Sequence, residues 1–219
     1  MKKLLFILSF ISFVMLSKST YASDTGTCGN NCHWALDDDG TLTVSGTGAM
    51  YDYNWDQTPW FEKNKNITNI VIENGITSVG LNAFYQTNAE TVSLPNSLKY
   101  IAPSAFQATK ITDIVIPNSV EVVGYHALSE LSLKSLTISD KTIFPIKDYF
   151  DYELKLFDYS DLSELKIYCT GDIQKCNDNL KNGGYENLKS NFKAKRRIYT
   201  LDEANRVAGK KNRVSIKYR

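Results

Sequence analysis

A 22-residue repeat is the feature of the sequence that most constrains its fold. Residues 70–84 align without a gap with residues 92–106 and again with residues 114–128. Eight columns of this alignment keep their character, and one of the apolar columns consists of Ile70, Val92, Ile114 and Leu136. Chance does not fill eight columns, so the repeat is internal, and its period lies in the range of leucine-rich solenoids.

Each unit is expected to supply one short strand and one compact turn. Ile70-Val71-Ile72 is short, β-branched and alternating, which is typical of a strand. Pro95 and Pro117 follow the equivalent strands and should end them, because proline has no N–H to donate to a ladder. A lone unit cannot bury its apolar face, so the units should stack and their strands should form a parallel sheet.

The repeat pattern Ile-x-Ile-Pro-Asn-Ser-Val-x-x-Ile-Gly-x-x-Ala-Phe resembles the BspA-type leucine-rich repeats of bacterial surface proteins. Residues 26–34 and 39–50 also resemble the segment that precedes such repeats, so the resemblance covers about residues 26–140. It implies a right-handed solenoid and a secreted or surface-located, adhesin-like binding role, with no shared catalytic residues. The chain departs from the family in having few repeats and a different end.

The first 22 residues predict a secretory signal peptide. Lys2 and Lys3 form a positive start, residues 4–16 form a short apolar run, and Thr20 and Ala22 stand where a signal peptidase reads. An uncleaved membrane anchor is the alternative, but the apolar run is short for a bilayer span. We therefore expect an exported protein in the periplasm, on the cell surface or secreted, with no transmembrane span after cleavage.

Four cysteines fit an oxidising compartment. Cys28 and Cys32 are four residues apart, and Cys169 and Cys176 are seven apart. Two local disulfides are the simplest pairing, although four cysteines allow three pairings. Cys28, Cys32 and His33 could begin a zinc site, but a second ligand pair at zinc-site spacing is missing, so we expect no metal and no cofactor.

Residues 23–66 predict an N-terminal cap. Alternating apolar residues between Trp34 and Val44 flank an Asp-Gly turn, which is typical of a β-hairpin. The three aspartates before Gly40 allow a calcium interpretation, but their spacing is not that of an EF-hand loop, so we interpret them as a solvated turn. The aromatic residues that follow should be core of the cap, or alternatively a binding platform: Tyr51, Tyr53, Trp55, Trp60 and Phe61.

The repeats are expected to span residues 67–176 and to end in an irregular unit. Leu162-x-x-Leu165-x-Ile167 restores the strand signature 29 residues after Leu133 instead of 22, which places seven extra residues within 143–159. This segment predicts a bulged convex side, or alternatively an aromatic patch for a partner, formed by Tyr149, Phe150, Tyr152, Phe157 and Tyr159.

Charge separates residues 177–219 from the rest. Residues 23–188 carry 11 basic and 22 acidic side chains, whereas residues 189–219 carry 11 basic and two acidic ones. We interpret residues 177–193 as a linker, followed by a strand–helix–strand appendage that starts at Arg197. Its basic residues could bind a polyanion, dock on the acidic repeats or be read by a sorting partner, and they are Lys195, Arg196, Arg197, Arg206, Lys210, Lys211 and Arg213. Nucleic acid is not expected, because an exported protein rarely meets it.

The sequence thus predicts a β-rich, α/β-type leucine-rich repeat solenoid that binds a partner. Core residues take the first, fourth and sixth positions of each strand signature, so the residues between them should form two exposed rows on the parallel sheet. These candidate contact residues are Asn69, Val71, Thr91, Ser93, Asp113, Val115, Ser135 and Thr137. The partner would be a protein or glycan on a cell surface or envelope.

Two other functions are compatible with the sequence. The chain could be a structural envelope component that its basic C-terminal segment anchors or sorts. It could also be a glycan or peptide hydrolase that uses His126 with a carboxylate, although no nucleophile elbow, phosphate loop or His-Glu-x-x-His motif occurs. His126 occupies a variable repeat position that we expect to be exposed, so the sequence favours a protein that is not an enzyme.

Overall fold

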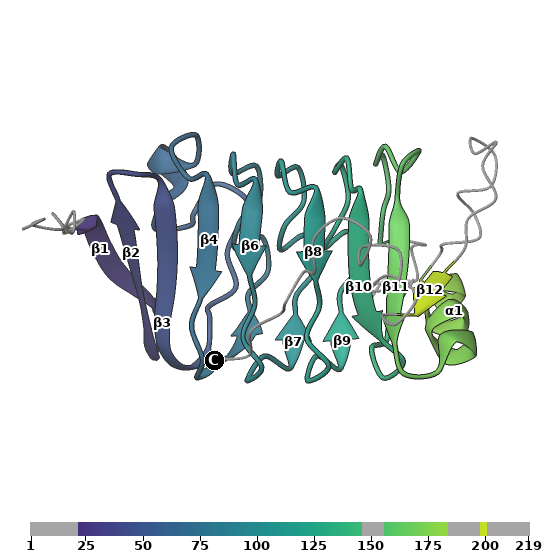
Figure 1. Ribbon diagram of the computed structural model, residues 1–219. Helices are drawn as coiled ribbons and strands as arrows, with labels where there is room; N and C mark the ends of the chain where they lie inside the picture. Colours follow the sequence, from purple (N-terminus) through teal and green to yellow (C-terminus); the bar gives the residue numbers. More distant parts are fainter. Residues whose placement is uncertain (1–21, 146–155, 184–197, 201–219) are drawn as a thin grey trace, which may run out of the picture.

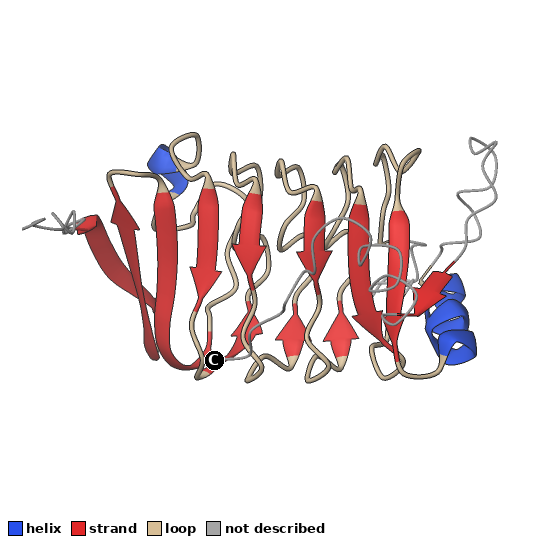
Figure 2. Cartoon of the chain, viewed as in Figure 1, coloured by secondary structure: helices blue, strands red, loops and turns tan. Residues whose placement is uncertain are grey.

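The computed structural model describes residues 22–145, 156–183 and 198–200. Its strands lie side by side in an elongated array in which each unit sits next to the preceding one (Figure 1). The predicted β-rich repeat fold with parallel strand pairing is confirmed. In the described segments, helix occurs near the two ends of the array, and the units between them consist of strands and turns (Figure 2).

The N-terminal cap contains three antiparallel strands, β1 (Ala22–Gly29), β2 (Asn31–Asp37) and β3 (Thr41–Ala49). The predicted hairpin is β2 and β3, and β1 is an additional strand. The aspartates before Gly40 build the turn, because Asp37 Oδ1 accepts the backbone N–H groups of Asp39 and Thr41 at 3.0 and 2.8 Å. Asp37 therefore has a structural role in this turn.

The first strand of each unit pairs in parallel with its neighbours. These strands are β4 (Asn69–Ile72), β6 (Thr91–Ser93), β8 (Asp113–Val115), β10 (Ser135–Ser139), β11 (Lys166–Thr170) and β12 (Ile198–Thr200). β3, β4 and β6 form one ladder and β8, β10, β11 and β12 another, and the two meet where β6 lies beside β8. As predicted, β6 ends before Pro95 and β8 ends before Pro117.

A second set of strands continues the units that begin with β4, β6 and β8, and the sequence did not reveal it. It contains β5 (Ile76–Val79), β7 (Tyr100–Ile101) and β9 (Val122–Val123), which pair in parallel in that order. β3 is long enough to pair with β4 through its first half and with β5 through its end. Strand β3 of the cap is therefore the first strand of the ladder that contains β4 and also of the ladder that contains β5.

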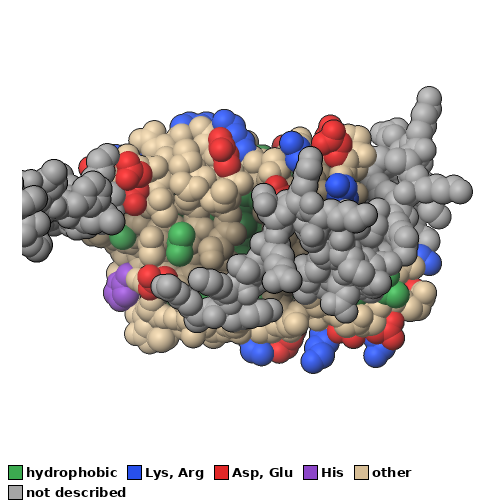
Figure 3. Space-filling view, in the orientation of Figure 1, with side chains coloured by type: hydrophobic (Ala, Val, Ile, Leu, Met, Phe, Trp, Pro, Cys, Tyr) green, Lys and Arg blue, Asp and Glu red, His purple; other side chains and the backbone are tan. Residues whose placement is uncertain are grey.

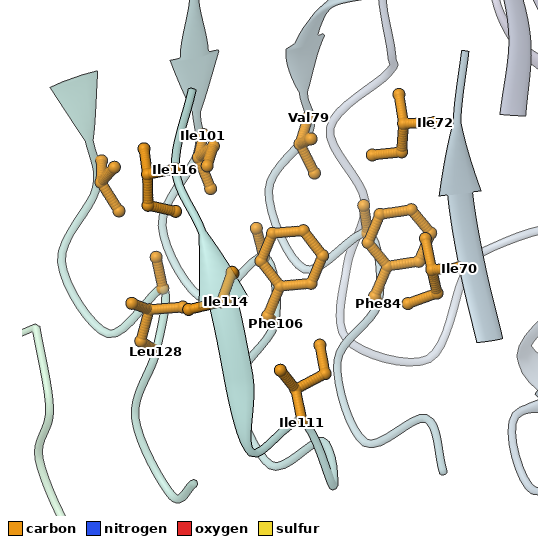
Figure 4. Packing of buried hydrophobic residues seen from close by; sticks show 14 of the residues in the cluster. Ile70, Ile72, Val79, Phe84, Ile101, Phe106, Ile111, Ile114, Ile116 and Leu128 are labelled. Atoms are coloured by element: carbon orange, nitrogen blue, oxygen red, sulfur yellow. The ribbon is translucent and has the colours of Figure 1, made fainter. Parts of the chain in front are cut away.

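The apolar columns of the repeat form one continuous core, in which Phe84 and Phe106 have parallel rings (Figure 4). Their ring centroids are 5.3 Å apart at an interplanar angle of 14°, and Trp60 stacks on the other side of Phe84 at 5.6 Å. Leu128 continues this column as a fully buried side chain. The small-residue column has a steric origin, since a Cβ on Gly124 would lie 2.6 Å from the backbone nitrogen of Pro103.

Two positions in each turn adopt the left-handed conformation without glycine. Asn82, Ser104 and His126 share a φ of 54°, and Gln86, Ala108 and Glu130 have φ between 57° and 59°. Both sets recur with the 22-residue period, and Tyr159 continues the second set at φ 58°. The turn geometry is therefore a property of the repeat, which each unit adopts despite the steric cost of this conformation for a residue with a Cβ.

The last unit corrects the predicted register of the final strand. β10 pairs with β11 so that Leu136 faces Ile167 and Ile138 faces Cys169, an offset of 31 residues instead of the predicted 29. Tyr159, which has a left-handed conformation, still follows Glu130 by 29 residues. The two additional residues of the offset therefore lie between Tyr159 and β11. The cause lies in Leu162 and Leu165, which are both buried in a turn ahead of the strand.

A helix, α1 (Ile173–Asn182), begins ahead of the predicted linker and includes its first residues, which corrects that prediction. The Asp172 side chain caps it by accepting from the backbone N–H groups of Gln174 and Lys175, and Cys176 and Leu180 face inward on successive turns. β12 then joins β11 in parallel, so this strand extends the main sheet instead of starting a separate appendage. The rest of the predicted appendage lies outside the described residues.

Candidate functional site

Two rows of side chains lie on the face formed by β4, β6, β8 and β10, and we call this surface the strand face. Asn69 and Val71 are half-buried, whereas Thr91, Ser93, Asp113 and Val115 are exposed, Val115 at 55 %. Where it is visible in Figure 3, the surface over β3 to β6 shows few charged side chains, and the charges gather along its edges. Over β3 to β6 the strand face therefore carries mostly small, uncharged side chains.

Hydrogen bonds between neighbours hold part of this face in place. The Thr91 hydroxyl donates to Asn69 Oδ1 at 2.8 Å across β6 and β4, and the Thr112 hydroxyl donates to Asp113 Oδ2 at 2.7 Å. Such contacts fix side-chain rotamers before a partner arrives. Ordering side chains on association costs about 0.5–1.5 kcal/mol each, and a face that is already ordered avoids part of that cost.

Thr137 is an exception to the predicted exposure of the rows. Its side chain is 8 % exposed and therefore buried. Its neighbours in register are Val115 on β8 and Tyr168 on β11. Thr137 is consequently unsuited to contact a partner directly.

The register of β11 adds residues that sequence reasoning missed. Because β11 is displaced by two residues from the predicted alignment, Lys166 stands beside Ser135 and Tyr168 beside Thr137. On the other side of the array, Thr41 and Thr43 of β3 lie in register with Asn69 and Val71. The rows are thus longer than predicted and gain a cation and an aromatic ring at one end.

Phe157 and Tyr159 of the predicted aromatic patch do not share an exposed surface. Phe157 is a core residue that is 1 % exposed, whereas Tyr159 is 90 % exposed. Phe157 is buried because it packs into the apolar core of the array. The other members, Tyr149, Phe150 and Tyr152, lie outside the described residues, and so do all seven basic residues of the C-terminal segment.

The aromatic residues of the cap divide into two groups. Trp60 is buried, and its indole N–H donates to the Ala83 carbonyl at 3.0 Å, as a core residue should. Tyr51 and Trp55 are exposed, so the expectation that they are core is wrong: both lie beyond the end of β3. Tyr53 packs at the edge of the core, and burial, followed by the nearby Tyr51, raises its pKa to about 12.

A further group of exposed aromatic and apolar residues lies along β7 and β9. Tyr100 is 39 % exposed, and it stands in register with Ser78 of β5 and Val122 of β9. Ile143, which bridges to Val122, is also exposed. Sequence reasoning missed this surface because the second set of strands was itself not recognised.

His126 is less exposed than expected. Its Nε2 lies 3.0 Å from Asp158 Oδ2, and the two side chains are 21 % and 24 % exposed. The pair links the turn after β9 to the segment 156–160, 32 residues further on. Its place between two turns indicates a structural contact. In the described segments, no three His, Cys, Asp or Glu side chains gather to hold a metal ion.

Both predicted disulfides are confirmed. Cys28–Cys32 joins β1 to β2, and Cys169–Cys176 joins β11 to α1. All four cysteines are buried. Among the helices of the described segments, none has the length and apolar character needed to cross a bilayer.

Comparisons with known proteins identify the fold. The solved structure of a leucine-rich repeat protein from Eubacterium ventriosum matches 68 % of this chain and 44 % of its own length, with 22 % identity and a TM-score of 0.50. The pneumococcal vaccine antigen PcpA matches 69 % of this chain and 51 % of its own length, with 13 % identity and a TM-score of 0.35. The chain thus spans about half the length of these proteins or less.

No curated protein matches the chain. The family model of the BspA type leucine rich repeat region matches residues 57–169, in six copies. These residues make up more than half of the chain and coincide with the stacked units from the end of the cap to β11. The chain therefore belongs to the BspA-type leucine-rich repeat family.

Proposed function

We propose that the chain is an exported binding protein that recognises a protein or glycan on a cell surface or envelope through its strand face. The observation that carries the proposal is the alignment of exposed, mostly uncharged side chains on successive strands, among them Thr91, Ser93 and Val115. A rigid sheet that repeats small side chains presents an extended flat surface, which is how repeat proteins contact their partners.

The ends of the rows supply the stronger contacts that small residues lack. Tight interfaces depend on tyrosine, tryptophan and arginine more than on serine and threonine. Tyr168 and Lys166 stand at the β11 end of the strand face, and Asp113 gives it a negative charge in the middle. We infer that a partner lies along the strand face and is anchored near β11. Buried disulfides at both ends of the array support export to an oxidising compartment.

The test is a single substitution in the middle of the strand face. Ser93→Arg places a long charged side chain on β6, and we expect it to weaken partner binding at least tenfold in Kd, about 1.4 kcal/mol. Asn96→Arg is the matched control, because Asn96 is exposed on the turn that follows β6 and receives the same new side chain.

The full chain and both variants would be labelled and applied to arrays of purified surface proteins and glycans. Circular dichroism would verify that the three proteins are equally folded. If the Ser93 variant binds with unchanged affinity to whatever the wild-type chain binds, the strand face is not the contact surface.

A further inference from the structure

The second set of strands carries a surface that the proposed binding through the strand face does not use. Tyr51, Asp52, Tyr100 and Tyr125, which we call the tyrosine surface, come from the end of β3, from β7 and from the turn after β9. Tyr51 and Tyr100 are exposed, and Tyr125 is half-buried. Ser78, which stands beside Tyr100 in register, is small, so a low position lies next to the Tyr100 ring.

A fixed negative charge lies among these rings. Asp52 Oδ1 accepts the backbone N–H of Leu81 at 2.7 Å, which holds the carboxylate in place. Leu81 follows Ser78 by three residues, and Ser78 stands beside Tyr100 in register, so the carboxylate bound at Leu81 lies near Tyr100. Burial, followed by Asp52 and Tyr125, raises the pKa of Tyr100. Ring faces beside a carboxylate attract a guanidinium or ammonium group, because the ring quadrupole and the carboxylate act on it with the same sign.

We propose that the tyrosine surface binds the chain's own basic C-terminal segment, residues 201–219, through its arginine and lysine side chains. The charges are complementary. Residues 22–145 and 156–183 together carry 18 acidic and nine basic side chains, a net charge of −9. Residues 201–219 carry six basic and two acidic ones, a net charge of +4.

The segment is long enough to reach this surface. β12 ends at Thr200, and β11, β10 and β8 separate it from β6, whose unit also contains β7. Four strand spacings of about 4.8 Å amount to roughly 20 Å. The 19 residues after Thr200 span at most about 60 Å when extended, so the chain can cross the array and still lie along the tyrosine surface.

Limited trypsin digestion of the full-length protein tests the proposal, because trypsin can cleave the segment after five basic residues, from Arg206 to Lys217. Tyr100→Ser and Tyr125→Leu would be combined. These substitutions copy Ser78 and Leu81, which occupy the same repeat positions and leave the turn intact. Tyr85→Gln is the matched control, since it removes a tyrosine from another turn and copies Gln107.

Loss of the intact C-terminus would be followed by mass spectrometry at several protein concentrations. We expect the double variant to lose its intact C-terminus about fivefold faster than the wild type and the control do. In about 0.5 M NaCl, digestion of the wild-type C-terminus should accelerate by a similar factor. Equal rates in wild type and double variant overturn the proposal. Protection that increases with protein concentration also overturns it, because the surface would then hold a second copy. The readout requires no external partner, so it is independent of the strand-face test.

Discussion

Replacement of Phe106 is expected to show how strongly the aromatic column stabilises the array. Phe106 is fully buried, and it stacks on Phe84 at 5.3 Å. Truncation to alanine removes most of a buried ring and leaves a cavity, which costs about 3–5 kcal/mol. The next unit carries Leu128 at the same position, so the site accommodates leucine, and Phe106→Leu should cost about 1.5 kcal/mol or less. The two substitutions should therefore differ by at least about 1.5 kcal/mol.

Urea unfolding of the full chain measures both values. Far-UV circular dichroism reports on the strands, and tryptophan fluorescence reports on Trp60, which stacks on Phe84 in the same column. Combining Phe84→Leu with Phe106→Leu gives a double-mutant cycle, in which ring stacking should appear as a coupling of about 0.5–1.5 kcal/mol. If alanine and leucine at position 106 cost the same, or if the alanine variant loses less than about 1 kcal/mol, the argument from cavity formation is refuted.

Two further substitutions test the turns and the cap. Ala108→Gly should raise the free energy of unfolding by about 0.5–1 kcal/mol. Glycine removes the strain of the left-handed conformation at φ 58°, and this gain exceeds the free-energy cost of the greater conformational entropy that glycine gives the unfolded chain. Ala105→Gly, at a buried position without positive φ, should instead lower that free energy, and a drop at both positions in thermal melts would contradict the assignment of strain. Replacing Cys28 and Cys32 together by serine should cost about 2 kcal/mol from the loss of a short cross-link, measured by urea unfolding against the wild type under oxidising conditions. An effect on stability that persists when both proteins are reduced would instead indicate a packing effect of serine.

The repeat period allowed most of the core to be predicted from sequence. A column such as Ile76, Leu98 and Val120 is buried in all three units because stacking leaves no other place for it. The prolines predicted the strand ends for a backbone reason that does not depend on tertiary context. The two disulfides followed from short spacings, which favour local pairing. These predictions rest on local chemistry repeated at a fixed interval.

The second set of strands was not predictable by the same means. β7 and β9 are two residues long, too short for alternation to stand out in a sequence. They exist because β3 is long enough to begin a ladder for them, which is a property of the cap and not of any one repeat. The signal for α1 was present, in Asp172 as a cap and in the spacing of Cys176 and Leu180, but the surrounding polar residues obscured it.

The candidate site was predicted in part. The alternation of the strands placed Ser93 and Val115 on an exposed face, as the structure has them. Thr137 is buried although it holds the same row position as the exposed Val115, and the alternation of apolar and polar residues alone could not distinguish the two. Leu162 and Leu165 fit the strand signature as well as the true strand does, so the pattern of apolar residues alone could not decide the register.

The length of β3 has a mechanical consequence. A tensile force that separates the cap from the repeats must break two ladders of hydrogen bonds at once, from Thr41–Val44 to β4 and from Gly48 and Ala49 to β5. Between β7 and β9, by contrast, the ladder joins two residue pairs, Tyr100 with Val122 and Ile101 with Val123. Under load we expect the array to open within the repeats while the junction at β3 still holds, so the cap and the first unit would extend as one block.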